Sequence, residues 1–99
     1  MRPIHTATLD KARPVLVLTR GLVRPHLNSV TVAPITTTIR GLSTEVRVGP
    51  RNGLSQESAV ACDHITTIPV NALGEQIGLL LEDQESSLTE AIHAAFDLD

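Results

Sequence analysis

Short runs of aliphatic and β-branched residues, separated by glycine, proline and polar residues, fill the first seventy or so positions of this 99-residue chain. Such runs predict β-strands, because branched side chains pack well on a pleated surface. The expected strands are Ile4–Leu9, Arg13–Arg20, Ser29–Thr38, Thr44–Val48, Ser58–Cys62 and Ile65–Val70. Strands of this kind must bury their apolar faces against other elements, so we expect a mostly antiparallel sheet.

Turn-forming residues mark the connections between these strands. Asp10–Ala12 is a short connection, and Gly21–His26 contains the glycine and proline that predict one helical turn. Pro50–Gly53 carries the strongest turn signal in the chain. The segment Leu73–Gly78 is punctuated by glycine, and its pattern fits either a helical turn or a last strand.

A single amphipathic helix is predicted near the C-terminus, where apolar residues recur at helical spacing. The stripe consists of Leu88, Ala91, Ile92, Ala95 and Phe96. Either Ser86 or Ser87 is expected to cap the start of the helix, with Glu90 near its first turn. We expect the helix to pack across the sheet, which gives a mainly β (α+β) fold class and most simply a small antiparallel β-barrel. The chain length fits a single domain over residues 1–99.

The core has to be built from aliphatic side chains, since the chain has one Phe and neither Trp nor Tyr. A core this poor in aromatic residues gains stability when an oligomer buries more surface, so a homodimer is expected. Cys62 is the one cysteine and ends an apolar run, which predicts a buried, unreactive thiol. No signal peptide is evident and no apolar run reaches about 20 residues, so we expect a cytoplasmic protein with no membrane partner.

Charge is divided unevenly along the chain. All eight Lys and Arg residues lie in the first 51 positions, where Asp10 and Glu45 are the only acids, so this segment carries about +6. The remaining 48 residues carry about −9. The net charge of −3 argues weakly against nucleic acid, but a local basic surface can bind an anion, because salt screens charges over roughly 8–10 Å. The division therefore permits a polyanionic partner; a solvated dipole without a partner is the alternative.

An arginine and a threonine at strand ends are the candidates for chemistry. The four His residues and Cys62 show no metal-ligand spacing, and no phosphate-binding glycine loop or G-x-S-x-G motif occurs, so we expect neither a metal nor a cofactor. Arg13 begins one apolar run and Thr36 lies in the next. Arginine and hydroxyl groups suit cleavage of a ribose-phosphate chain, in which the substrate's own 2′-hydroxyl is the nucleophile. An Arg fork can hold the phosphate, and a Thr hydroxyl can donate to its developing charge.

Each of these residues also has a purely structural explanation. Arg13, before a proline, is compatible with a solvated residue at a strand start. Thr36–Thr38 has high β-propensity and is compatible with an ordinary strand surface. His64, beside Asp63, is compatible with a surface pair or a hydrogen-bonded bend. Residue types and spacing alone therefore predict only a small β-rich domain with a candidate anion site.

Several short segments occur in an order and at spacings that match a known family. These segments are Arg13–Thr19, Val30–Leu42, Thr44–Val46, Gly53–Leu54, Ser58–Asp63, Thr67–Pro69, Leu73–Gly74 and Ile77–Gly78. The ordered set covers almost the whole chain and resembles the MazF/PemK family of toxin endoribonucleases, most of all its short actinobacterial members.

The resemblance implies a small SH3-like, CcdB-like barrel, usually a homodimer, that cuts single-stranded RNA at short sequence motifs without a metal ion. It also implies products with a 2′,3′-cyclic phosphate and a 5′-hydroxyl, and inhibition by a MazE-like antitoxin whose disordered tail covers the RNA groove. The catalytic arginine of the family falls on Arg13 and its catalytic threonine on Thr36. The residues expected near the RNA are Lys11, Thr37, Thr38, Ser58, His64 and Thr66.

The chain departs from the family pattern in features that affect recognition. Family members usually carry a longer loop where this chain has only Asp10–Ala12, so a charged helper from that loop is missing unless Asp10 or Lys11 replaces it. The family often has Glu-Gln-Ile-Arg-Thr where this chain has Asp63–Thr67, which places His64 for Gln and Thr66 for Arg and predicts a different base preference. Without Tyr or Trp for stacking, recognition must depend on hydrogen bonds and groove shape.

The residue that moves the proton, and the function class itself, each have an alternative. Arginine remains protonated in proteins, so it cannot act as the base. His64 is our hypothesis for proton transfer, because Asp63 could orient its ring, and Asp10 is a second candidate. The alternative function is a CcdB-like toxin of the same fold that inhibits a protein target such as gyrase, and a peptide-binding barrel is disfavoured by the single Phe.

Overall fold

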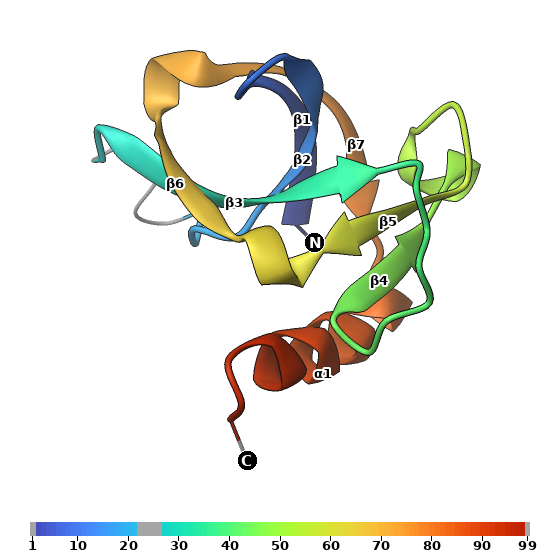
Figure 1. Ribbon diagram of the computed structural model, residues 1–99. Helices are drawn as coiled ribbons and strands as arrows, with labels where there is room; N and C mark the ends of the chain where they lie inside the picture. Colours follow the sequence, from blue (N-terminus) through green and yellow to red (C-terminus); the bar gives the residue numbers. More distant parts are fainter. Residues whose placement is uncertain (1, 22–26, 99) are drawn as a thin grey trace.

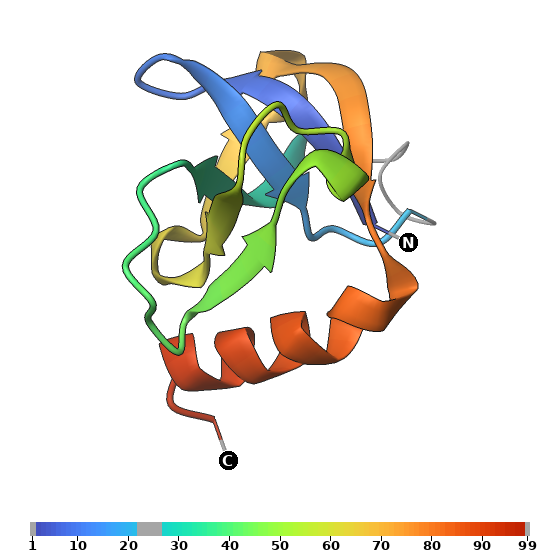
Figure 2. The same ribbon diagram turned by 90° about the vertical axis from the view of Figure 1, so that its right-hand side faces the viewer.

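The chain folds into a curled antiparallel sheet, a half-barrel, with one helix packed below it in Figures 1 and 2. The structure is a computed structural model that describes residues 2–21 and 27–98. The strands are β1 (Arg2–Thr8), β2 (Ala12–Val17), β3 (Ser29–Thr36), β4 (Glu45–Val48), β5 (Ser58–Ala61), β6 (Thr66–Pro69) and β7 (Leu73–Leu80). The helix is α1 (Glu85–Ala95), and 3₁₀ turns occupy η2 (Pro50–Asn52), η3 (Cys62–His64), η4 (Val70–Ala72) and η5 (Glu82–Gln84). The predicted mainly β fold with a C-terminal helix is confirmed.

The strand order in the sheet is β4-β5-β3-β2-β1-β7, with β6 paired to β3. Figure 1 shows β1, β2, β3, β6 and β7 bending round into an open ring, while β4 and β5 extend toward α1. The ambiguous segment Leu73–Gly78 is part of strand β7, paired with β1. The turn predicted at Pro50–Gly53 is confirmed as η2, closed by Gly53 at a φ of 89°. Apart from Gly21, the helical turn predicted at Gly21–His26 lies outside the described residues.

Two strands end two or more residues earlier than predicted, at points where threonine side chains take over backbone hydrogen bonds. Strand β2 ends at Val17, and just beyond it the Thr19 hydroxyl accepts from the Thr31 amide at 2.8 Å, where a ladder would use a carbonyl. Strand β3 ends at Thr36, whose hydroxyl accepts from the Thr38 amide at 3.0 Å and closes a tight turn. Both departures place polar groups at the strand ends.

The core has two parts because the central strands are covered on both faces. Leu16 in β2 belongs to a cluster shared with β4, β5 and α1, whereas its neighbours Val15 and Val17 belong to a second cluster inside the ring. All three side chains are fully buried. Burial on both faces explains why β2 is a continuous apolar run rather than an alternating one.

The helix begins two or three residues earlier than its predicted caps imply. Helix α1 starts at Glu85, directly after η5, so Ser86 and Ser87 lie inside its first turn and neither caps it. Gln84 precedes the helix, and its side-chain oxygen accepts from the Leu81 amide at 2.9 Å. The predicted stripe also loses its last member, because the helix ends at Ala95 and Phe96 is 55% exposed.

Candidate active site

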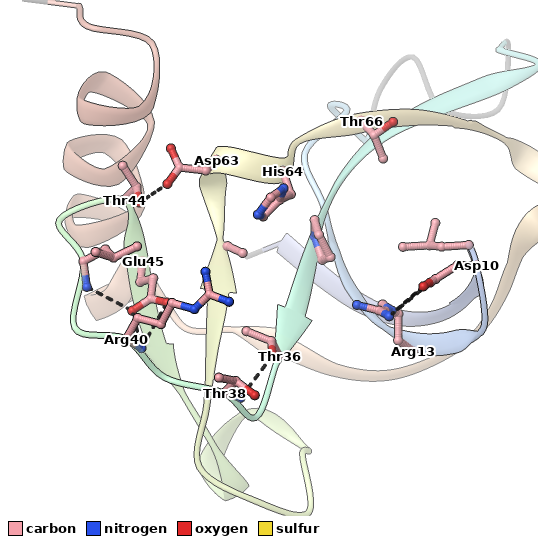
Figure 3. A pocket seen from close by; sticks show the side chains of 14 residues that line it. Asp10, Arg13, Thr36, Thr38, Arg40, Thr44, Glu45, Asp63, His64 and Thr66 are labelled. Carbon is pink, nitrogen blue, oxygen red and sulfur yellow. Dashed lines mark hydrogen bonds and ion pairs between the residues drawn. The ribbon is translucent and has the colours of Figure 1, made fainter.

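A cavity of about 430 Å³ opens at the mouth of the ring, over the end of β3 (Figure 3). Its lining comes from the β1–β2 hairpin, the ends of β2 and β3, the loop between β3 and β4, and the η3–β6 segment. The lining residues are Leu9, Asp10, Arg13, Pro34, Thr36, Thr38, Arg40, Leu42, Thr44, Glu45, Ala61, Asp63, His64 and Thr66. Segments far apart in the sequence therefore place polar side chains around one cavity.

The pairing register of β2 and β3 brings Arg13 and Thr36 together. The ladder pairs Val15 with Pro34 and Val17 with Val32. Arg13 and Thr36 each lie two residues beyond the Val15–Pro34 pair, and side chains two apart in a strand share a face, so both are directed to the same side of the sheet. Both residues line the cavity.

The Arg13 guanidinium is held from the β1–β2 hairpin. Its Nη2 donates to the two Asp10 carboxylate oxygens at 3.0 and 3.4 Å. In the β1–β2 ladder Arg13 is paired with Ala7, whose small methyl group leaves room for the long arginine side chain. The buried Nε of Arg13 has no hydrogen-bond partner among the described residues. Arg13 therefore keeps donors available on a side chain whose position is fixed by Asp10.

The Thr36 hydroxyl is oriented by its own turn. Its oxygen accepts from the Thr38 backbone amide at 3.0 Å, and no acceptor for its proton is found among the described residues. A hydroxyl has one proton and two lone pairs, so a lone pair fixed by Thr38 leaves the proton free to point elsewhere. The Thr36 side chain can therefore donate to a ligand in the cavity.

The loop between β3 and β4 is organised by a carboxylate that sequence reasoning did not select. Glu45 Oε1 accepts from the backbone amides of Arg40 at 3.2 Å and Leu42 at 3.1 Å. Between them, Gly41 has a φ of 71°, a conformation that favours glycine. Arg40 and Glu45 were also missed as cavity residues; the available signals were the Arg-Gly pair and the rarity of acids in the basic part of the chain.

His64 and Asp63 do not form the pair that motivated the proton-transfer hypothesis. The Asp63 carboxylate accepts from the Thr44 hydroxyl at 2.6 Å, and no hydrogen bond joins it to His64 in the described part of the chain. Figure 3 shows the His64 ring turned toward the cavity and Asp63 turned toward Thr44. His64 and Thr66 line the same cavity as Arg13 and Thr36. Asp63 therefore connects η3 to Thr44, directly before β4, and does not orient the His64 ring.

Three of the residues expected near the RNA lie away from this cavity. Thr37 and Ser58 line a second cavity of about 380 Å³. Thr37 directly follows Thr36, and successive side chains of an extended chain point to opposite faces. Ser58 is buried, and its hydroxyl donates to the Gln56 carbonyl at 3.0 Å. Lys11 is exposed at the tip of the β1–β2 hairpin and is not part of either lining.

The Cys62 thiol is buried below the site, as predicted. Burial, and secondarily the neighbouring Asp63 charge, raise the pKa of Cys62 to about 11, so the thiol is neutral at physiological pH. No three His, Cys, Asp or Glu side chains among residues 2–21 and 27–98 are grouped so that they could hold a metal ion. In the same residues, no helix has the length and apolar character needed to cross a membrane.

Residues 3–96 match the family model described as PemK-like, MazF-like toxin of type II toxin–antitoxin systems. The chain belongs to this family. Among MazF relatives, endoribonuclease MazF3 of Mycobacterium tuberculosis is 69% identical over 99 residues, which covers all of this chain and 96% of MazF3. Membership agrees with the resemblance stated from the sequence segments and excludes unrelated explanations of the fold.

Solved structures of MazF proteins share the fold. The Mycobacterium tuberculosis toxin MazF-mt6 superposes with a TM-score of 0.97 at 68% identity, over 99% of both chains. An endoribonuclease from a mycobacterial species, solved in complex with its cognate antitoxin, superposes with a TM-score of 0.87 at 26% identity, over 98% of this chain and 93% of that one. The half-barrel with its C-terminal helix is thus the MazF-type fold.

Proposed function

We propose that this MazF-family chain is an endoribonuclease that cleaves single-stranded RNA without a metal ion, through attack by the 2′-hydroxyl of the substrate. The observation that carries the proposal is that Arg13 and Thr36 line the same cavity. The activity named for the relative MazF3 supports it. The products are a 2′,3′-cyclic phosphate and a 5′-hydroxyl, and loss of messenger or other RNA inhibits translation and growth.

The reaction needs charge stabilisation and the movement of one proton on each side of phosphorus. The 2′-oxygen forms a bond to phosphorus, the bond from phosphorus to the 5′-oxygen breaks, and charge grows on the non-bridging oxygens. Arg13 donates to these oxygens as a fork, and the Thr36 hydroxyl adds another donor. Because Asp10 and Thr38 already hold these two side chains, little reorganisation is required when the charge develops.

The proposed proton-transfer groups are His64 and Asp10. His64 lines the cavity, and a neutral imidazole carries both a proton acceptor and a proton donor. Asp10 lies beside the Arg13 guanidinium. One group removes the proton from the 2′-hydroxyl, and the other returns a proton to the 5′-oxygen. A pH–rate profile of His64→Gln tests this role: unchanged rate and shape would remove His64 from the mechanism and leave Asp10.

The test of the function uses end-labelled single-stranded RNA in EDTA. We expect cleavage by the native chain and a loss of about 10²-fold or more in rate for Arg13→Ala and for Thr36→Val. Arg47→Ala and Thr31→Val are matched controls, since both residues lie outside the cavity lining, and they should cleave at the native rate. A single 2′-deoxy nucleotide at the mapped cleavage site should block the reaction.

The outcomes separate the alternatives. No cleavage by the native chain would contradict the proposal and favour the CcdB-like toxin that inhibits a protein target. Cleavage that survives Arg13→Ala would retain the activity and overturn the site. Cleavage of the 2′-deoxy substrate would exclude the proposed nucleophile.

The proposed protein partners are an antitoxin and a second copy of the chain. A mycobacterial relative has been solved with its cognate antitoxin, and we propose that a MazE-like antitoxin inhibits this chain by covering the RNA groove. The homodimer is supported by exposed apolar side chains such as Leu27 and Val70, which are 42% and 43% exposed. Light scattering at micromolar concentration should give twice the monomer mass; the mass of one chain would contradict the dimer.

A further inference from the structure

Each Asp, Glu and Arg side chain that lines the cavity, except Arg40, has a hydrogen-bond or ion-pair partner in the described part of the chain. Arg13 is paired with Asp10. The Glu45 carboxylate accepts backbone amides, and the Asp63 carboxylate accepts from Thr44. Arg40 is left: no carboxylate in the described part of the chain lies within ion-pair distance of its guanidinium.

The direction of the Arg40 side chain makes this charge available to a ligand. Figure 3 shows the guanidinium extending from its loop toward the centre of the cavity, across from His64 and on the side opposite Arg13. An exposed arginine with no role commonly pairs with a neighbouring acid or extends into solvent. Here Glu45 is adjacent, but its oxygens are occupied by main-chain amides.

We propose that Arg40 is a substrate-binding residue whose guanidinium holds an RNA phosphate next to the one that is cleaved. The proposal rests on the proposed endoribonuclease function. Arg13 is already paired with Asp10, so Arg40 is the remaining cation of the cavity lining with no ion-pair partner in the described part of the chain, and its guanidinium can take up a phosphate. A guanidinium fork suits a phosphodiester, which presents two unesterified oxygens.

Glu45 acts as the positioning residue for Arg40. Its carboxylate accepts from the Arg40 amide at 3.2 Å and from the Leu42 amide at 3.1 Å, and so fixes the backbone on both sides of Gly41. The Arg40 amide also donates to Glu45 Oε2 at 3.3 Å, and in Glu45→Gln one of the two oxygens is replaced by an NH₂ group, which cannot accept from an amide. The loop should then loosen, and Arg40 should lose its fixed direction without losing its charge.

The test measures RNA cleavage by the native chain and by Arg40→Gln, Arg40→Lys, Glu45→Gln and Arg47→Gln over a series of salt concentrations. Arg47→Gln is the matched control, because it removes the same charge from an exposed residue of β4 outside the cavity. We expect Arg40→Gln to raise KM about tenfold with kcat within about twofold of native. Each phosphate contact to a single strand contributes about 0.7 to the slope of log(kcat/KM) against log salt, so the slope should fall by about that amount.

The other variants make the result specific. Arg40→Lys should keep the salt slope but raise KM, because lysine keeps the positive charge but cannot donate two parallel hydrogen bonds to the phosphate as a guanidinium does. Glu45→Gln should raise KM by a smaller factor, and the Arg40→Gln, Glu45→Gln double variant should be no worse than Arg40→Gln alone, because the two residues act through one contact.

Native cleavage with Arg40→Gln indistinguishable from Arg47→Gln would overturn this inference and leave the proposed function intact. An effect of Arg40→Gln that changes which motif is cut, with an unchanged salt slope, would also overturn it, because that result indicates a base contact. Absence of cleavage by the native chain would instead contradict the proposed function itself.

Discussion

The Asn52 side chain joins three parts of the fold, and its removal gives the most direct test of how the half-barrel is held to its helix. Asn52 is 2% exposed. Its Oδ1 accepts from the Gly49 amide at 3.0 Å, and its Nδ2 donates to the Leu79 carbonyl at 2.9 Å and to Gln84 Oε1 at 2.6 Å. One buried amide therefore connects η2, the end of β7 and the residue that precedes α1.

The expected loss for Asn52→Ala follows from these contacts. Each hydrogen bond contributes about 1 kcal/mol net, and each buried polar group left without a partner costs about 1–3 kcal/mol. Gly49 and Leu79 are the groups that lose their side-chain partner, while Gln84 Oε1 still accepts from the Leu81 amide. We therefore expect the free energy of unfolding to fall by about 3 kcal/mol. For a domain of this size the midpoint of thermal unfolding should fall by about 10–20 °C.

The assay is urea unfolding followed by far-UV circular dichroism at one protein concentration, since the chain has no Trp or Tyr for fluorescence. Asn71→Ala is the matched control, because Asn71 is exposed, and its free energy of unfolding should stay within about 0.5 kcal/mol of native. Asn52→Asp should lose at least as much as Asn52→Ala, because a carboxylate would face two acceptors. A loss under 1 kcal/mol for Asn52→Ala, or an equal loss for Asn71→Ala, would refute the reasoning.

Further predictions concern the core, a backbone crossing and alkaline pH. Gly78→Ala should lower the free energy of unfolding by about 2–3 kcal/mol, because the added Cβ would overlap the carbonyl oxygen of Asn52 at the end of η2. Gly41→Ala is the control: its Cβ would have open space, and the φ of 71° alone should cost about 1 kcal/mol. Leu88→Ala should lower the free energy of unfolding by about 2–5 kcal/mol, since the Leu88 side chain is 1% exposed. Leu98 is 53% exposed, so Leu98→Ala should leave the free energy of unfolding measured in urea nearly unchanged. The raised pKa of Cys62 means that the native state keeps its proton longer than the unfolded chain. Stability should therefore be complete below pH 9 and fall by about 2–3 kcal/mol as pH rises from 9.0 to about 11. Cys62→Ala should lose that part of the pH dependence, and equal curves for the two proteins would contradict the assignment.

The strands could be predicted from the sequence because β-branched runs and turn residues are local signals, but their ends could not. The end of β2 depends on a hydrogen bond between the Thr19 hydroxyl and the Thr31 amide, twelve positions apart. The start of α1 depends on η5, which leads directly into the helix and leaves Ser86 inside it. Capping serines are a statistical signal, and here a preceding 3₁₀ turn overrides it.

The site was only partly accessible to sequence reasoning for the same reason. Arg13 and Thr36 could be selected because each stands at the end of an apolar run and matches the family segments. Arg40 and Glu45 also lie within the family segments, but neither stands at the end of an apolar run, and their arrangement arises from side-chain to backbone contacts within a loop. The Asp63–His64 adjacency suggested a pair, but a neighbour in sequence is not a neighbour in space when a 3₁₀ turn directs the two side chains apart.

The short β1–β2 hairpin determines how Arg13 is held at the cavity. Because the hairpin turns within Leu9–Lys11, it brings Asp10 back over Arg13 at 3.0 Å. That contact fixes the guanidinium, but it also offsets the charge that a phosphate needs. Arg40, on the loop whose backbone amides Glu45 accepts, is the other cation of the cavity and has no ion-pair partner in the described part of the chain. We therefore expect binding strength and catalytic rate to separate in this protein: charge changes at Arg40 should move KM and the salt slope, and changes at Asp10 should move kcat.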